Sequence, residues 1–285
     1  MNAAAVNATV ANVLTIAGVD PSGGAGVLAD IKTFSALGAY GCGVIAALTA
    51  QNTRAVTGVH TPPVDFLRQQ IDTLFADVSI HAVKLGMLGT ADIVRTVAEG
   101  LAHHSASNVV CDPVMVAKSG DHLLARDAVA MLREALLPQC FMITPNLPEA
   151  GVLLESRAPD TVREMYRAAE RLRDQLPTSS ERWVLLKGGH LPGNAVTDLL
   201  FDGDRMIEMS APRIETRNTH GTGCTLSSAI AALLPQRQSM IAPAEAAVRD
   251  AREYLLRALV AARSLSVGEG HGPVHHFHSL WRLPT

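Results

Sequence analysis

The sequence has few aromatic residues, no excess of positive charge and no long apolar run, and each absence argues against a class of function. Aromatic residues make up 4% of the 285 residues, which argues against base-stacking platforms for nucleic acid. The net charge is −3, so bulk electrostatics provides no basis for binding nucleic acid or an anionic membrane. Because no apolar run of about 18 residues occurs, we expect no transmembrane helix.

Cysteine is also scarce, and its spacing does not match a metal-binding motif. The four cysteines, Cys42, Cys111, Cys140 and Cys224, lie far apart and form no C-x-x-C motif. This pattern predicts reduced thiols in a cytoplasmic protein, not a disulfide framework or a zinc site. Residues 1–10 are rich in Ala and Asn and lack a basic segment, so we expect a short disordered lead-in, not a signal peptide. We expect one domain over residues 11–285.

Several motifs of common enzyme classes are missing. The sequence contains no G-x-x-x-x-G-K-[ST] and no complete G-x-G-x-x-G, which disfavours a P-loop and a classical dinucleotide fold. It also lacks H-E-x-x-H and G-x-S-x-G, the motifs of a zinc-protease helix and of a nucleophile elbow. A nucleotide, if one binds, must therefore be held in another way.

What is present is a regular alternation of short apolar runs and amphipathic segments. The alternation predicts an α/β fold with a central, mostly parallel sheet and helices on both faces. Near residues 195–209 two β-rich runs flank Asp202-Gly203-Asp204, which indicates a small antiparallel β edge. The expected strands lie at residues 13–17, 44–48, 82–85, 108–111, 141–143, 183–186, 195–201 and 205–209.

Polar and glycine-rich clusters follow the predicted strands repeatedly. Ligands of parallel α/β sheets bind beyond the carboxyl ends of the strands, so these clusters should share one edge. Their recurrence favours an enzyme or a ligand-binding protein. The clusters occupy residues 20–26, 51–52, 86–87, 112, 146–149, 187–189 and 218–224.

The cluster at residues 218–224 opens a predicted helix over residues 226–234. Gly221 and Gly223 there would let backbone N–H groups converge on a phosphate or an oxyanion, at the positive end of the helix. Cys224 lies in the same turn, where we expect its thiolate to be stabilised. The alternative is an ordinary glycine-rich helix cap.

Two other strand-end clusters allow both a chemical and a structural interpretation. Asn146 and Glu149 lie three residues apart at a helix start and share a face. Glu149 would suit a hydrated Mg²⁺ near a triphosphate, or the two residues form a helix cap. Lys187 follows an apolar strand and precedes two glycines, so it either meets a phosphate or is simply solvated.

Three further hypotheses rest on single features. Cys224 and His220 could form the pair of a cysteine hydrolase, and the chain could be a catalytically silent ligand-binding module. The histidines near the C-terminus suggest either a metal site or a docked tail, and the tail is favoured because Mg²⁺-dependent chemistry uses oxygen ligands. These histidines are His271, His275, His276 and His278.

Taken together, the motifs resemble the ribokinase-like superfamily and, within it, the hydroxymethylpyrimidine/phosphomethylpyrimidine kinases of thiamine biosynthesis. The matching segments run in family order over nearly the whole chain. They are T-I-A-G-V-D-P-S-G-G-A-G at 15–26, D-I-K-T-F-S-A-L-G-A-Y-G at 30–41, A-L-T-A-Q-N-T at 47–53, K-L-G-M-L at 84–88, D-P-V-M-V-A-K-S-G at 112–120, I-T-P-N-L-P-E-A at 143–150, L-K-G-G-H at 186–190, N-T-H-G-T-G-C-T-L-S at 218–227 and G-P-V-H-H-F-H at 272–278.

The resemblance implies ATP- and Mg²⁺-dependent phosphorylation of 4-amino-5-hydroxymethyl-2-methylpyrimidine and then of its monophosphate, by a cytoplasmic homodimer. It implies small-molecule partners, with no nucleic acid and no membrane. Pyridoxal kinase, which shares the scaffold, is the alternative, and Gln51 in its A-Q-N-T context favours the pyrimidine.

The resemblance also implies residue roles. Gly221, Gly223, Cys224 and Lys187 are expected at the catalytic centre, the first two in an anion hole and Cys224 as the candidate base. The substrate would contact Gln51, Asp30, Gly18, Met87 and Val114. The nucleotide would contact Lys187, Thr219, Thr222 and Asn146, and the metal would lie near Glu149 and Asp112. Apart from the resemblance, the polar residues at 117–120, with Lys118, make this segment the candidate lid.

Overall fold

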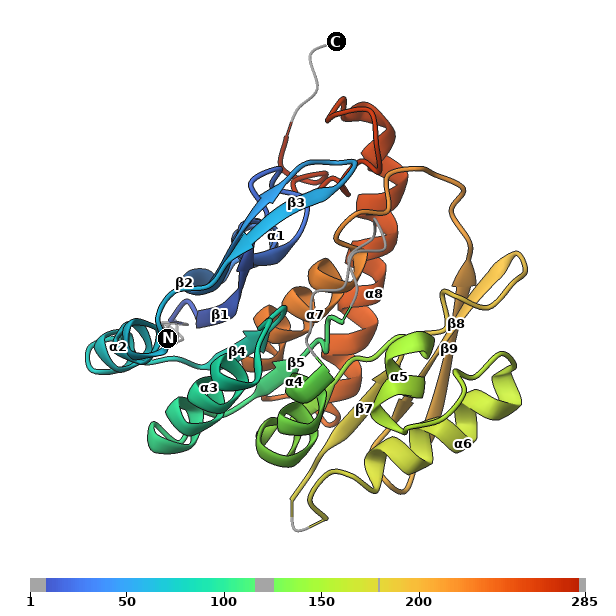
Figure 1. Ribbon diagram of the computed structural model, residues 1–285. Helices are drawn as coiled ribbons and strands as arrows, with labels where there is room; N and C mark the ends of the chain where they lie inside the picture. The colour runs from blue at the N-terminus through green and yellow to red at the C-terminus, as the bar shows by residue number, and fades with distance from the viewer. Residues whose placement is uncertain (1–8, 116–125, 179, 282–285) are drawn as a thin grey trace, which may run out of the picture.

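The computed structural model describes residues 9–115, 126–178 and 180–281. Within them the chain forms one nine-stranded sheet with the order β3-β2-β1-β4-β5-β6-β7-β8-β9 (Figure 1). The strands are β1 (Asn12–Val19), β2 (Tyr40–Gln51), β3 (Val56–His60), β4 (Ala82–Leu85), β5 (Val109–Cys111), β6 (Met142–Ile143), β7 (Trp183–Leu186), β8 (Ala195–Phe201) and β9 (Met206–Pro212).

The sheet is parallel in its centre and antiparallel at both ends. The strands from β2 to β7 pair in parallel, while β8 and β9 run antiparallel beyond β7. These features confirm the predicted fold class and the predicted β edge. The opposite edge, where β3 pairs antiparallel with β2, was not predicted. The strand β3 is short and holds Gly58, so it carries little of the apolar signal on which strand prediction depends.

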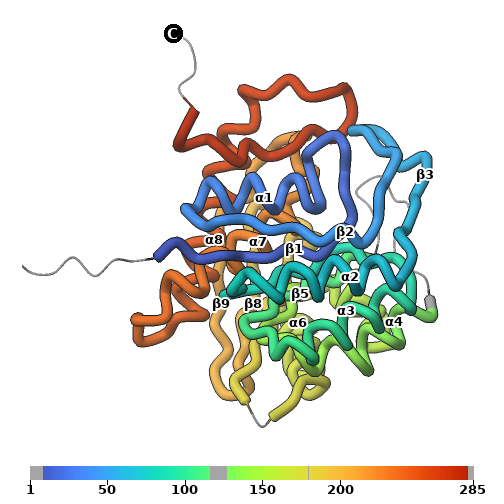
Figure 2. Tube along the Cα trace, turned by 90° about the vertical axis from the view of Figure 1, so that its left-hand side faces the viewer, coloured from blue at the N-terminus to red at the C-terminus, as the bar shows by residue number. Residues whose placement is uncertain are grey.

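Helices cover both faces of the sheet (Figures 1 and 2). Buried side chains of α2 to α6 pack in one core cluster, and those of α1, α7 and α8 pack in the other. The helices are α1 (Gly26–Ala36), α2 (Val64–Phe75), α3 (Ala91–His103), α4 (Arg126–Met131), α5 (Leu147–Leu153), α6 (Val162–Arg173), α7 (Thr222–Leu233) and α8 (Pro243–Ala261).

The strand β1 shows how one apolar strand serves both cores. Leu14 and Ile16 belong to one cluster and Val13 to the other, and none of the three has exposed surface. Successive side chains of a strand point to opposite faces, so a strand covered on both sides must be apolar throughout. This requirement explains the continuous apolar run.

Parts of the sequence-based prediction differ from the structure or lie outside it. The helix expected at residues 127–137 ends as α4 at Met131 and continues as a π turn (Leu132–Leu136) and a 3₁₀ turn (Leu137–Gln139). Pro138 there lacks the N–H group that a regular helix would use. The candidate lid at residues 117–120 and most of the predicted lead-in lie outside the described residues. Among the helices that the structure describes, none is long and apolar enough to span a membrane.

Candidate active site

Two glycine loops, residues 20–26 after β1 and residues 218–224 before α7, pack directly against each other. Gly221 has a φ of +75°, and a Cβ atom on it would lie 1.8 Å from the carbonyl oxygen of Gly24. A Cβ atom on Gly24 would lie 2.4 Å from Cδ2 of His220. Any larger residue at Gly221 would therefore separate the two loops.

A buried carboxylate organises the contact between the loops. Asp20 accepts hydrogen bonds from the backbone N–H groups of Ser22 (2.8 Å) and Ala25 (3.0 Å), and its Oδ2 lies 2.7 Å from Nε2 of His220. Burial would raise the pKa of Asp20, but the hydrogen bonds from His220 and Ser22 hold it below its usual value. Since His220 Nε2 pairs with Asp20, the geometry does not support His220 as the base of a cysteine hydrolase.

The helices α1 and α7 both begin without a side-chain cap. Their N-cap residues are Ala25 and Gly221, and neither supplies a capping hydrogen bond. The first N–H groups of a helix have no intrahelical partner, so an uncapped start leaves donors for a ligand. The backbone N–H of Gly26, at the start of α1, is directed at the thiol of Cys224 in the first turn of α7.

The prediction of a stabilised thiolate at Cys224 is wrong. Burial raises the pKa of Cys224 to about 11, and the positive charge of Lys84 and the N–H of Gly26 offset this only in part. Asp30 and Asp112 raise the pKa further. A helix N-terminus favours a thiolate by a modest amount, which desolvation outweighs here. The side chain is a neutral thiol at pH 7.

Asp30, predicted as a substrate contact, is fully buried beneath this centre. Its carboxylate accepts two hydrogen bonds from Nζ of Lys84 (2.9 and 2.8 Å), one from Thr15 (2.6 Å) and one from Ser228 (2.6 Å). A contribution of Asp30 to substrate binding would therefore act through these partners. Lys84 was not predicted from the sequence, although a lysine within an apolar strand is a recognisable signal of a buried ion pair.

Lys187 and Asp112 lie under the first turn of α7. Nζ of Lys187 donates to Oδ1 of Asp112 at 2.7 Å, and a Cβ atom on Gly223 would lie 3.3 Å from that Nζ. Burial would lower the pKa of Lys187, but the carboxylates of Asp112 and Glu149 raise it above its usual value. Lys187 is thus a cation beside the N-terminus of a helix, with a side chain that is only 14% exposed.

Asn146 and Glu149 form the helix cap that was one of their two interpretations. Oδ1 of Asn146 accepts from the N–H of Glu149 at 2.9 Å, and Oε2 of Glu149 accepts from the N–H of Asn146 at 2.7 Å. Burial raises the pKa of Glu149 to about 7; Asp112 adds to the effect and Lys187 opposes it. A buried carboxyl with this pKa is stabilised by any added cation, so capping and metal binding are compatible.

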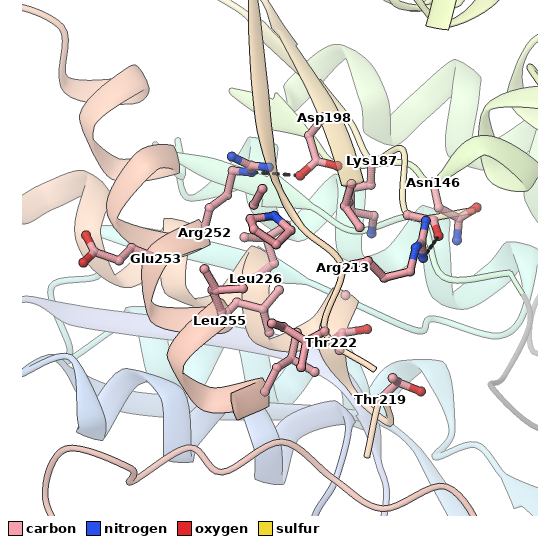
Figure 3. A pocket seen from close by; sticks show the side chains of 18 of the residues that line it. Asn146, Lys187, Asp198, Arg213, Thr219, Thr222, Leu226, Arg252, Glu253 and Leu255 are labelled. Carbon is pink, nitrogen blue, oxygen red and sulfur yellow. Dashed lines mark hydrogen bonds and ion pairs between the residues drawn. The ribbon is translucent and has the colours of Figure 1, made fainter. Parts of the chain in front are cut away.

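The predicted nucleotide residues line one cavity of about 540 Å³ (Figure 3). Asn146, Lys187, Thr219 and Thr222 border it together with Gly223. The polar end at Lys187 and Asn146 continues into an apolar wall on which Leu226 and Leu255 lie (Figure 3). The part of this wall that α8 supplies was not predicted from the sequence, because that helix shows only ordinary amphipathic spacing. The apolar lining residues are Val196, Ala211, Pro212, Ile214, Leu226, Leu255, Leu256 and Leu259.

The predicted substrate residues lie elsewhere along the same sheet edge. Gly18, Gln51 and Met87 are at or just beyond the carboxyl ends of β1, β2 and β4, and Val114 follows β5. The N–H of Gly18 donates to the carbonyl oxygen of Met87 at 3.0 Å. Gln51 is held by a hydrogen bond from Thr49 at 3.0 Å. The site thus has two halves, with the cavity at the β7–β9 end of the sheet.

The buried C-terminal histidines, His275 and His276, pack on α7 and α8. His275 and His276 are each 4% exposed, and Nε2 of His276 lies 3.2 Å from Oγ1 of Thr225. Among the residues that the structure describes, no group of three or more His, Cys, Asp or Glu side chains is arranged to hold a metal ion. The burial and the contacts of these histidines support the docked tail.

Known proteins share both the sequence and the fold. The family model of phosphomethylpyrimidine kinase matches residues 20–275. The chain is 53% identical to the hydroxymethylpyrimidine/phosphomethylpyrimidine kinase of Escherichia coli over 95% of this chain and 98% of the relative. A Clostridium difficile phosphomethylpyrimidine kinase structure has a TM-score of 0.75 and 37% identity, covering 87% of this chain and 99% of its own. The Staphylococcus aureus pyridoxal kinase, in complex with AMP-PCP and pyridoxal, has a TM-score of 0.83 and 30% identity, covering 95% and 94%.

The nine-stranded sheet, with two glycine loops and Lys187 at one edge, has the fold of a ribokinase-like kinase. The match over residues 20–275 and the high identity to curated relatives narrow this class further. The chain belongs to the phosphomethylpyrimidine kinase family, as the sequence motifs predicted.

Proposed function

We propose that the protein phosphorylates the hydroxymethyl group of 4-amino-5-hydroxymethyl-2-methylpyrimidine with ATP, and then phosphorylates the monophosphate to the diphosphate, in thiamine biosynthesis. One observation carries the proposal. Lys187 and Asp112 meet under Gly223, where the uncapped N-terminus of α7 opens onto the cavity. Phosphoryl transfer depends mainly on positioning and on charge stabilisation, which a fixed cation and free N–H groups provide.

The two halves of the site suit two substrates. The cavity lined by Lys187, Thr219, Thr222 and Asn146 combines a cation with an apolar wall, as a nucleotide requires. Gln51 offers an amide donor and acceptor for an aminopyrimidine edge, and Met87 and Val114 offer apolar contacts for a flat ring. The transferring group would then lie between the halves, at the start of α7.

Asp112 and Glu149 would hold Mg²⁺. Both carboxyl groups are at least 90% buried, and the raised pKa of Glu149 shows that its negative charge is under-compensated. Mg²⁺ commonly uses one or two carboxylates and completes its coordination with water and phosphate oxygens. Bound there, the ion would neutralise charge on the phosphates.

We assign to Cys224 the orientation of the substrate hydroxyl group. With a pKa of about 11 the thiol is protonated at pH 7 and is a poor resting general base. A loose phosphoryl-transfer reaction needs little base assistance but strict alignment.

The test is ADP release by purified protein with the pyrimidine, its monophosphate or pyridoxal as acceptor. We expect turnover of both pyrimidines; no turnover of the monophosphate would contradict the proposal. Cys224→Ala should fold normally and lose about 10²–10³ in kcat, by analogy with removal of one oriented hydrogen-bonding group. Cys224→Ser should retain more activity than Cys224→Ala if the residue orients the hydroxyl.

Pyridoxal phosphorylation is a second candidate function, favoured by one observation. The pyridoxal kinase structure superimposes with the higher TM-score, 0.83 against 0.75, although its sequence identity is lower, 30% against 37%. Sequence identity bears more directly on the side chains of the site, so we rank the pyrimidine first. Comparing kcat/KM for pyridoxal and for the pyrimidine decides between them.

We also propose that the protein is a cytoplasmic homodimer. Its four cysteines are free, which fits a reducing compartment. Large apolar side chains are exposed on the edge hairpin and on α2, with Leu48 49%, Val59 50% and Phe66 55% exposed. Covering such residues favours association. Light scattering after gel filtration measures the mass, and a mass near the 30.2 kDa of one chain would contradict the dimer.

A further inference from the structure

The segment of residues 268–276, here named the C-terminal strap, joins two parts of the site that are distant in sequence. In Figure 2 the C-terminal segment (red) runs beside α1 to the hairpin of β2 and β3. At that hairpin the N–H of Gly270 donates to Oγ1 of Thr53 at 3.1 Å, and the N–H of His271 donates to the carbonyl oxygen of Thr53 at 2.9 Å. Thr53 lies two residues beyond Gln51.

The other end of the strap is bound to the second glycine loop, to α7 and to α8. The N–H of His220 donates to the carbonyl oxygen of Gly272 at 3.0 Å. His276 lies 3.2 Å from the hydroxyl of Thr225, the residue after Cys224, and the hydroxyl of Tyr254 donates to the carbonyl oxygen of His276 at 2.7 Å. Three separate contacts therefore fix this end.

Alternate glycines allow the strap to approach both parts closely. A Cβ atom on Gly270 would lie 2.0 Å from the carbonyl oxygen of Thr53, and one on Gly268 would lie 2.3 Å from Oγ1 of Thr53. A Cβ atom on Gly272 would lie 2.1 Å from Oδ1 of Asn218. Real Cβ atoms do not make such contacts, so a side chain at any of these positions would force Thr53 or Asn218 to shift. No other part of the proposed mechanism uses these glycines.

We propose that the C-terminal strap positions the two halves of the site relative to each other, with Gly270 and Gly272 as positioning residues. Gly270 sets the hairpin that carries Gln51, and Gly272 sets the loop that leads to Gly221 and Cys224. The inference rests on the proposed function, because that function assigns the pyrimidine to Gln51 and the transferring phosphoryl group to the glycine loop. A displacement of about 1 Å between reacting groups is enough to cost about 10²-fold in rate.

The two glycines should have separable kinetic effects. Gly270→Ala displaces the hairpin, so we expect KM for the pyrimidine to rise about tenfold with KM for ATP nearly unchanged, as loss of ground-state binding predicts. Gly272→Ala displaces the glycine loop, so we expect kcat to fall about tenfold with little change in KM for the pyrimidine. The matched control is Gly58→Ala in the same hairpin, where a Cβ atom would lie an ordinary 3.6 Å from Cβ of Ala50. It should behave as the wild type.

A second substitution tests the steric mechanism. Asn218→Ala removes Oδ1, the atom that a Cβ atom on Gly272 would meet. Effects of contacting residues are non-additive, so the Gly272→Ala/Asn218→Ala double variant should have a kcat no lower than that of Asn218→Ala alone. Hydrogen exchange provides a readout besides activity. Gly270→Ala should speed exchange of the β2–β3 amides, and Gly58→Ala should not.

The outcomes separate the two proposals. If the wild type is active but both glycine variants have unchanged kinetics, the role of the strap is refuted and the proposed function is unaffected. Multiplicative losses in the double variant would have the same consequence. A wild type that phosphorylates neither pyrimidine refutes the proposed function, and the hydrogen-exchange comparison then still decides whether the strap holds the hairpin.

Discussion

Burial shifts the pKa of two ionisable residues, the buried Glu149 and the partly exposed Cys224, in the direction that favours the neutral form. The pKa of Glu149 is raised to about 7 and that of Cys224 to about 11. Desolvation is the main cause for both, since removal of water penalises the charged form. Their neighbours Lys187 and Lys84 are engaged by aspartates, so they compensate these two residues only in part.

The raised pKa of Glu149 predicts how stability depends on pH. The folded state binds this proton more tightly than the unfolded state between the ordinary value of 4.5 and about 7. The free energy of unfolding should therefore fall as pH rises through this window and stay lower above it. In the Glu149→Gln variant this pH-dependent decrease in the free energy of unfolding should be smaller by about 1–3 kcal/mol. Urea unfolding at pH 5 and pH 8 measures it, with exposed Glu99→Gln as the control. Equal decreases in Glu149→Gln and the wild type would contradict the assignment.

The thiol of Cys224 should be slow to alkylate. Only the thiolate reacts, so the rate with iodoacetamide should still be rising above pH 9, toward a midpoint of about 11. The other three cysteines are buried, so Cys224→Ala supplies the background rate. Mass spectrometry follows the modification. Full reaction at pH 7 at the rate of a low-pKa thiol would show that the helix N-terminus outweighs burial.

At the scale of elements, a buried ion pair ties α1, α7 and β4 together. Asp30 of α1 binds Lys84 of β4 and Ser228 of α7, with Ser228 one turn beyond Cys224. The N-termini of α1 and α7 are thereby held side by side. The ion pair positions the glycine loops without touching solvent.

Breaking this ion pair should cost much stability. Asp30→Asn leaves the ammonium of Lys84 buried without its counter-charge, which costs about 3–5 kcal/mol. Lys84→Met should also destabilise, whereas the double variant should lose clearly less than the sum of the two, because no charge is then left unpaired. Urea unfolding of the four proteins gives the coupling energy. Additive losses would mean that the pair is not coupled in the folded state.

The elements also show what the sequence can and cannot predict. Period-2 and period-3.6 patterns located the central strands and most helices, and glycine-rich motifs located both loops and Lys187. The pattern could not reveal β3, whose pairing with β2 depends on tertiary contact. The family resemblance implied Asp30 as a substrate contact but not its burial, because the partners Lys84 and Ser228 are 54 and 198 residues away. The thiolate of Cys224 was mispredicted because desolvation depends on the whole fold.

On the scale of the whole molecule, the cavity draws on elements from distant parts of the chain. Asn146 precedes α5, Lys187 follows β7, Leu226 lies on α7 and Leu256 lies on α8. A nucleotide that bridges them would bind the folded state only, since the unfolded chain cannot assemble the cavity. Binding and folding are therefore linked.

This linkage predicts that a non-hydrolysable ATP analogue with Mg²⁺ raises the unfolding temperature. At a ligand concentration 100 times Kd the free energy of unfolding gains about 2.7 kcal/mol. Leu256→Ser should lose most of the gain, because the half-buried leucine lines the apolar wall, while fully exposed Ile241→Ser should keep it. Calorimetry with and without ligand measures the difference for each protein. If Leu256→Ser and Ile241→Ser gain equally, the nucleotide base does not lie on α8, and its site must be sought elsewhere along the sheet edge.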